Sequence, residues 1–174
     1  MINSETTLEE LAYIVCTGLK NHQIDAVLTG GAAVSIYTEN KYQSFDLDFI
    51  SYKSHKEIAT AMKSLGFSQK NRYFVHPETK YFVEFPPGPI SLGAEFVKKW
   101  ALLKKGDRLL QILTPTQSVK DRLASFFHWD DKESLNQAIW IFQNQEVDLE
   151  DIKRWAKNEK SEEKLKFFLD KISA

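Results

Sequence analysis

The stretch "VLTGGAAVSIYTENKYQSFDLDFIS", residues 27–51, places two adjacent glycines before an Asp-Leu-Asp that lies inside an apolar run. The residues before the glycines are typical of a short buried strand, and "AAVSIY" after them favours a short helix. In "SFDLDFIS" apolar residues alternate with Asp46 and Asp48, which predicts a strand with both acids on one face. Carboxylates in apolar surroundings are costly unless they are paired, hydrogen-bonded or bound to a metal. The rest of the sequence must therefore explain the two acids.

Asp46 and Asp48 would leave this strand about 7 Å apart along the backbone. Two such charges repel, and without a cation one of them tends to hold a proton. A divalent ion removes the conflict, and Mg²⁺ (or Mn²⁺) suits it, because Mg²⁺ takes one or two carboxylates and completes its shell with water and substrate phosphates. The dipeptide pattern alone is weak evidence, since a solvated sheet face and a glycosyltransferase-like site also produce it.

Two further features point to the same site. Gly30 and Gly31 follow a strand and precede a helix, where backbone N–H groups can hold phosphate oxygens and glycine lets an anion approach closely. An ordinary tight turn is the plainer interpretation of any Gly-Gly. Glu84 lies in a second apolar strand, "YFVEF", and leaves the face opposite to its large neighbours. The three acids and the glycines are thus compatible with one site on neighbouring strands.

The remaining patterns predict an α+β chain. A small mixed β-sheet core flanked by helices occupies residues 1–113, and a helical lobe occupies residues 114–174. The first helix begins where Thr6 and Glu9 have capping-box spacing. Hairpins are predicted around residues 72–85 and around "KKGD" at residues 104–107, and helical patterns follow Thr114, Asp131, Asp148 and Ser161.

Composition restricts the function classes. The net charge of −1 argues against a broad electrostatic nucleic-acid binder. The lone Cys16 excludes an intrachain disulfide and fits a reducing compartment. With no signal peptide and no apolar run of membrane-spanning length, we expect a cytoplasmic protein that does not bind membranes.

At "VLTGG", "FDLDFI" and "YFVEF" the chain resembles the nucleotidyltransferase superfamily, whose fold is shared with polymerase β. Within it, the chain is most similar to small bacterial proteins grouped with the toxin nucleotidyltransferases of type IV toxin–antitoxin systems. The resemblance covers about residues 24–86 and, more loosely, "TPTQSVKDRLASFFHWDD". It implies a metal-dependent enzyme that moves a nucleoside monophosphate from an NTP to an acceptor hydroxyl. The acceptor would be RNA or protein, and an antitoxin or other partner protein is possible.

The resemblance also implies residue roles. Asp46, Asp48 and Glu84 would be the catalytic metal ligands, and Gly30 and Gly31 would seat the triphosphate. The toxin enzymes have a lysine on a C-terminal helix that contacts nucleotide phosphates, and its counterpart here is Lys120, although a solvated helix face is an equal alternative.

The sequence departs from the family at two positions. Ala32 stands where many relatives carry a serine, with Ser35 and Ser44 nearby, and Glu84 is longer than the more frequent Asp. These departures keep open a catalytically degenerate binding or regulatory module of the same fold.

A third hypothesis is a small-molecule (antibiotic) adenylyltransferase. Its cationic acceptor would need an acidic pocket, for which the helical lobe offers Asp130, Asp131 and Glu133. Capping of the next helix is the commoner role for Asp130 or Asp131. For Trp129 a core position is favoured over stacking on a base.

Overall fold

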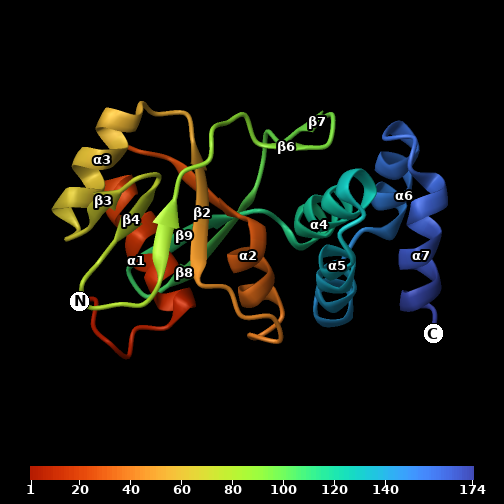
Figure 1. Ribbon diagram of the computed structural model, residues 1–174, viewed down its shortest axis with the longest axis horizontal. Helices are drawn as coiled ribbons and strands as arrows, with labels where there is room; N and C mark the ends of the chain where they lie inside the picture. The colour runs from red at the N-terminus through yellow and green to blue at the C-terminus, as the bar shows by residue number, and fades with distance from the viewer.

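The computed structural model describes residues 1–174 and consists of two lobes side by side (Figure 1). The first lobe contains a seven-stranded sheet and three helices, and the second contains four helices. The strands of the sheet are β1 (Ala26–Thr29), β2 (Asp46–Ser51), β3 (Ser68–Lys70), β4 (Tyr73–Val75), β5 (Phe82–Glu84), β8 (Ala101–Lys105) and β9 (Arg108–Ile112). Their order in the sheet is β3-β4-β5-β2-β1-β9-β8, and a separate hairpin is formed by β6 (Ser91–Leu92) and β7 (Glu95–Phe96).

The structure contains seven helices. They are α1 (Leu8–Asn21), α2 (Gly30–Tyr37), α3 (His55–Ser64), α4 (Pro115–Trp129), α5 (Lys132–Asn144), α6 (Leu149–Asn158) and α7 (Glu162–Ile172). None of them combines the length and the apolar character that crossing a membrane requires. The predicted α+β class, a mixed sheet with flanking helices and a C-terminal helical lobe, is confirmed.

The start of α1 corrects the sequence prediction by one residue. The capping box is formed by Thr7 and Glu10: the Thr7 hydroxyl accepts the Glu10 N–H at 3.2 Å, and the Glu10 carboxylate accepts the Thr7 N–H at 2.8 Å. Thr6 is used in the preceding turn, where its hydroxyl accepts the Asn3 N–H at 2.9 Å. Both threonines have an acid three residues later, so spacing alone did not distinguish them.

The register of β2 brings the acids together. Strand β2 runs antiparallel to β1 and parallel to β5, with Asp46 beside Phe82 and Asp48 between Thr29 and Glu84. Side chains of directly paired residues leave the same face of a sheet. The acids of β2 and β5 therefore share one face.

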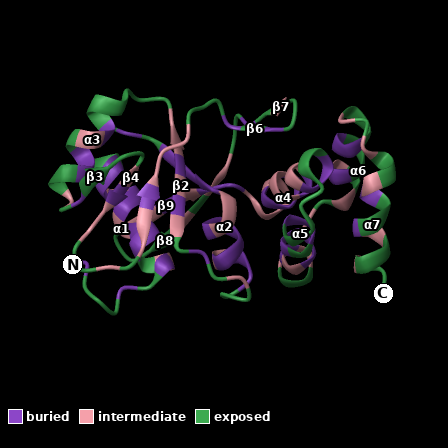
Figure 2. Ribbon diagram, viewed as in Figure 1, coloured by how far each residue is buried: buried purple, intermediate pink, exposed green.

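The opposite face of these strands supplies part of the core. Leu47, Phe49 and Val83 have no exposed surface, and Figure 2 shows buried segments along the central strands of the sheet. One buried apolar cluster continues from this sheet into the helical lobe, where Phe127 stacks on Trp155 with ring centroids 5.4 Å apart. The two lobes thus share one core, with α2 packed against both α4 and α5.

The hairpin β6–β7 was not predicted from the sequence. It leaves the sheet lobe and lies against the helical lobe, where β6 contacts α4 (Figure 1). The chain then returns to the sheet as β8 and β9, whose turn lies at the predicted "KKGD". The hairpin is therefore a second connection between the lobes, beside α2.

Candidate active site

Asp46, Asp48 and Glu84, hereafter the carboxylate triad, converge on one face of the sheet. Each offers a carboxylate oxygen, and these three atoms lie within 4.8 Å of one another. All three residues are partly buried, and the Ser44 hydroxyl donates to Asp46 Oδ1 at 3.0 Å. The convergence that the strand alternation predicted is confirmed.

The electrostatics of the triad centre on Asp48. Burial, followed by the charges of Asp46 and Glu84, raises the pKa of Asp48 to about 7. Its Oδ1 atom is buried and has no hydrogen-bond partner. A buried carboxylate oxygen without a donor is unfavourable, so this arrangement favours binding of a cation.

The Gly-Gly turn lies directly against Asp48. Gly30 has φ +66°, and a Cβ at that position would lie 2.9 Å from Asp48 Oδ2. A Cβ on Gly31 would lie 3.0 Å from the Tyr42 ring. Thr29, the N-cap of α2, makes no side-chain hydrogen bond to the first turn of the helix. The helix N-terminus is therefore uncapped beside the triad, where its N–H groups can receive an anion.

No residue with a side-chain hydroxyl follows the glycines directly. Ala32 has no exposed surface and is part of the core. The Ser44 hydroxyl, however, would lie 3.3 Å from a Cβ on Gly31, so a hydroxyl is present beside the turn. Ser44 comes from the segment before β2, and sequence spacing could not place it there.

Arg122 of α4 is the cation of the helical lobe whose charge acts on the triad. Its positive charge lowers the pKa of Asp48, against the larger opposing effects of burial and the neighbouring acids. Arg122 Nη2 pairs with Asp121 at 2.6 Å, and Nη1 donates to Gln137 at 3.4 Å. Its buried Nε has no partner, like Asp48 Oδ1. Helical spacing does not distinguish Arg122 from Lys120, because both lie between the core residues Val119 and Leu123.

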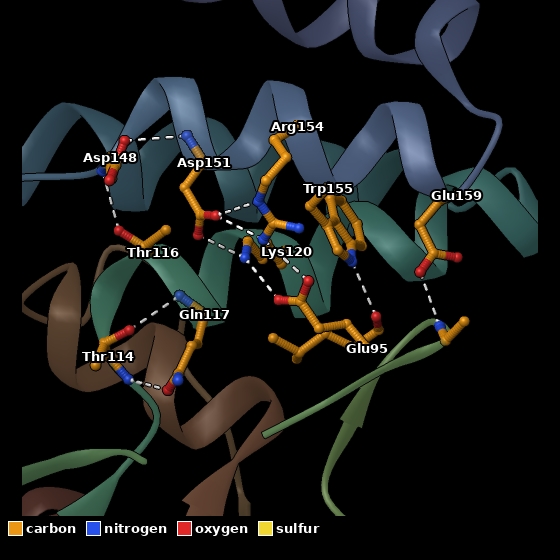
Figure 3. A network of polar contacts seen from close by, with 12 residues as sticks. Glu95, Thr114, Thr116, Gln117, Lys120, Asp148, Asp151, Arg154, Trp155 and Glu159 are labelled. Atoms are coloured by element: carbon orange, nitrogen blue, oxygen red, sulfur yellow. Dashed lines mark hydrogen bonds and ion pairs between the residues drawn. The ribbon is translucent and has the colours of Figure 1, made fainter. Parts of the chain in front are cut away.

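Lys120 has different neighbours. Its side chain is 3% exposed, and its ammonium pairs with Glu95 at 3.0 Å and with Asp151 at 2.6 Å. Arg154 pairs with the same two acids, at 2.9 and 2.6 Å (Figure 3). We call Glu95, Lys120, Asp151 and Arg154 the Lys120 network. No triad acid is among the ion-pair partners of Lys120, so the structure does not bring this predicted nucleotide contact to the other site residues, and the contact stays a prediction.

The Lys120 network fastens the hairpin to the helical lobe. Glu95 comes from β7, Lys120 from α4, and the other two residues from α6 (Figure 3). Trp155 donates its indole N–H to the Leu92 carbonyl at 2.9 Å, and Glu159 accepts the Ala94 N–H at 2.8 Å. Burial opposes ionisation of Glu95 and Asp151, yet hydrogen bonds from Lys120 and Arg154 hold the pKa of both acids below its ordinary value. The network is thus a fully paired structural contact.

Trp129, Asp130 and Asp131 lie at the junction between α4 and α5. Asp131 caps α5 and accepts the N–H groups of Glu133 and Ser134, while Asp130 is the left-handed C-cap of α4 and lies 3.7 Å from Lys164. The preference for a capping role is confirmed for Asp131. The expectation of a core position for Trp129 is wrong, because this side chain is 82% exposed. It occupies the last position of α4, where the helical spacing turns it away from the core residues Phe126 and Phe127.

The triad fits a divalent metal by its donor set. Mg²⁺ and Mn²⁺ bind oxygen ligands, for Mg²⁺ at about 2.1 Å, so oxygens separated by less than 5 Å can be shared by one or two ions with little movement. Asp48 Oδ1 supplies a ligand atom that nothing in the protein uses. The uncapped N-terminus of α2 lies next to it and suits the phosphates that complete a Mg²⁺ shell.

Comparison with known proteins places the fold. The sequence matches no protein-family model and no curated protein. In structure the chain is similar to an antigenic nucleotidyltransferase-like protein from Paracoccidioides brasiliensis, with a TM-score of 0.60 and 14% sequence identity. The similarity covers 81% of this chain and 78% of that one. The chain therefore has a nucleotidyltransferase-like fold.

Proposed function

We propose that this protein is a divalent-metal-dependent nucleotidyltransferase, which transfers a nucleoside monophosphate from an NTP to an acceptor hydroxyl. The observation that carries the proposal is the convergence of the carboxylate triad within 4.8 Å, with one buried ligand oxygen left unpartnered. The nucleotidyltransferase-like fold supports the same class of reaction. Asp46 and Asp48 would hold both metal ions, and Glu84 would hold the one on the acceptor side.

In this reaction the acceptor oxygen forms a bond to the α-phosphorus of the NTP, and the bond to the pyrophosphate oxygen breaks. Glu84, which is partly buried in the triad, would help to take up the hydroxyl proton. The bound ions supply neutralisation of the phosphate and acid charges, as in two-metal sites. The remaining contribution of the protein is to position substrates.

The phosphate side of the site is assigned to α2 and α4. The uncapped N-terminus of α2 at Gly30 and Gly31 would receive phosphate oxygens. Arg122 would approach the triphosphate from the helical lobe, where its unpartnered Nε can donate. Lys120 contributes indirectly in this proposal, because its ion pairs hold α4 against the hairpin.

For the acceptor we propose a hydroxyl of RNA or of a protein side chain, as in the toxin nucleotidyltransferases that the sequence resembles. A cationic antibiotic acceptor is less well supported by the structure. Two of the acids that would form its pocket are engaged, Asp131 in capping α5 and Asp130 in an ion pair with Lys164. If the protein acts as a toxin, an antitoxin would be its natural partner.

The test is transfer of label from each α-³²P-labelled NTP, with Mg²⁺ or Mn²⁺, to bulk tRNA or to a protein extract. We expect label in one macromolecular fraction with the wild type and none with Asp48→Asn. Labelling that persists in Asp48→Asn would contradict the assignment of the site. Absence of labelling with every NTP and both acceptors would contradict the enzyme.

One observation favours a second candidate, a binding module that has lost catalysis. Ala32 offers no hydroxyl at the position where relatives carry serine. Such a module would still bind an NTP with metal, and the ligand would raise its melting temperature without any transfer. A thermal shift with ATP, CTP, GTP or UTP in the absence of labelling would support this candidate.

A further inference from the structure

Arg72 contacts the triad from the edge of the sheet. It lies in the turn between β3 and β4, and its Nε is 3.2 Å from Glu84 Oε1. The neighbouring Tyr73 holds the same guanidinium in two ways: its hydroxyl accepts from Nη2 at 2.6 Å, and its ring centroid is 4.9 Å away. The Arg72 side chain is 70% exposed and that of Glu84 is 20% exposed, so the ion pair is open to solvent on the arginine side.

The Arg72 guanidinium offsets the negative charge of only one of the three triad acids. Of the three acids, Glu84 alone has an ion-pair partner, whereas Asp46 accepts only from the neutral Ser44 hydroxyl and Asp48 Oδ1 accepts from nothing. An exposed ion pair contributes little to stability, because water screens it and the long side chain loses freedom. A divalent cation carries twice the charge of the guanidinium and binds carboxylate oxygens directly. Glu84 can therefore exchange Arg72 for a metal ion at low cost.

We propose that Arg72 is a displaceable counter-ion of Glu84, which makes the two metal positions of the site unequal. The inference rests on the metal site of the proposed function. The position held by Asp46 and Asp48 fills first, because no protein cation has to leave. The position that needs Glu84 fills second and more weakly, because the guanidinium must move away. Tyr73 retains Arg72 after this exchange, since neither of its two contacts involves Glu84.

The test measures Mn²⁺ binding to the full-length protein. Bound Mn²⁺ is quantified from the decrease in the electron paramagnetic resonance signal of free Mn²⁺. Arg72→Gln removes the counter-ion from an exposed turn and should leave the melting temperature of the metal-free protein nearly unchanged. We expect the weaker Mn²⁺ site to tighten by about two- to fivefold, the range of an exposed ion pair. Arg72→Lys keeps the charge and should stay closer to the wild type.

The matched control is Arg108→Gln, which makes the same charge change near the other edge of the sheet, on β9. It should leave Mn²⁺ binding as in the wild type. Equal or weaker Mn²⁺ binding by Arg72→Gln, or equal tightening by Arg108→Gln, would overturn the inference. Asp48→Asn separates this outcome from failure of the proposed site: if Asp48→Asn binds Mn²⁺ like the wild type, or the wild type binds none, the metal site itself is wrong, and the role of Arg72 falls with it.

Discussion

The carboxylate triad and the Lys120 network both gather charges in partly buried places, but their charges are balanced differently. The Lys120 network contains two acids and two cations, and the ammonium at its centre pairs with both acids. The triad contains three acids, and its one ion-pair partner is the exposed Arg72. The pKa values of the acids differ accordingly: those of Glu95 and Asp151 are lowered, whereas that of Asp48 is raised to about 7.

The difference in charge balance indicates that the Lys120 network has a structural role and that the triad has a binding role. In a balanced network each buried charge has a partner, so the removal of one partner is costly, and the network links separate elements, here a hairpin and two helices. A group of acids that outnumbers its cations is unfavourable and must be offset by stabilising interactions elsewhere in the fold, and such sites are typical of metal and substrate binding. The two clusters should therefore respond in opposite ways when one charge is removed.

The largest effect is expected for activity when a triad acid is neutralised. Asp46→Asn and Asp48→Asn should each lower nucleotide transfer by about 100-fold or more, a loss typical of removing one electrostatic stabiliser from an active site. The free energy of unfolding of the metal-free protein should stay the same or rise slightly, because repulsion is relieved and no buried cation is left unpaired. Labelling assays and urea unfolding measure the two quantities.

The control for these variants is Asp107→Asn in the exposed turn between β8 and β9. It should change neither activity nor stability. A loss of stability of several kcal/mol in both triad variants would show that the acids have a structural role, like those of the Lys120 network.

The largest effect on stability is expected in the Lys120 network. Lys120→Met keeps much of the side-chain volume but leaves Glu95 and Asp151 without their buried partner. Loss of one member of a buried pair costs about 3–5 kcal/mol, and we expect the lower end because both acids are about one-third exposed. Urea unfolding should show this, with Lys157→Met on the exposed side of α6 as the control. A loss below about 1 kcal/mol would place the network among weak surface pairs.

A smaller effect is expected at the Gly-Gly turn. Gly30 and Gly106 both have positive φ, +66° and +59°, but a Cβ on Gly30 would meet Asp48, whereas one on Gly106 would meet no atom within 4 Å. Gly106→Ala should therefore cost only the backbone strain, about 1–2 kcal/mol. Gly30→Ala should cost more and should also weaken Mn²⁺ binding, because it displaces the Asp48 carboxylate. Equal losses in the two variants, with unchanged metal binding, would contradict the close approach of Gly30 to the site.

The smallest effect is expected from pH. The pKa of Asp48 is about 7 in the folded protein, against a reference value of 3.8, so the folded state holds its proton up to neutral pH. The contribution of the raised Asp48 pKa to the free energy of unfolding is complete below about pH 4 and is lost as the pH rises toward 7. Metal competes with this proton, so Mn²⁺ affinity should rise about tenfold between pH 6 and pH 8. Asp48→Asn should remove most of this dependence, and a wild-type affinity that stays constant across this range would contradict it.

Local sequence patterns predicted much of the fold, because strand alternation, turns and helix caps depend on residues that are close together in the chain. Alternation identified β2 and β5, turn residues identified the hairpin between β8 and β9, and capping signals identified α4 and α6. The errors were local as well. Two threonines compete at the start of α1, and Trp129 lies at a helix end where the apolar pattern stops. The short hairpin β6–β7 has no periodicity long enough to be detected, and its position depends on contacts with α4 and α6.

The sequence by itself determined which residues could form the site, because strand alternation directs Asp46, Asp48 and Glu84 to one side of their strands. Only the tertiary structure decided which partners each charge has. The parallel pairing of β2 with β5 brought Glu84 to Asp48. The packing of α4 placed Lys120 against Glu95 and Asp151, and it placed Arg122 where its charge acts on Asp48. The physical reason is that alternation follows from the backbone of one strand, whereas charge pairing depends on segments far apart in the sequence. Two neighbouring cations on one helix thus acquired different surroundings, which no local pattern could distinguish.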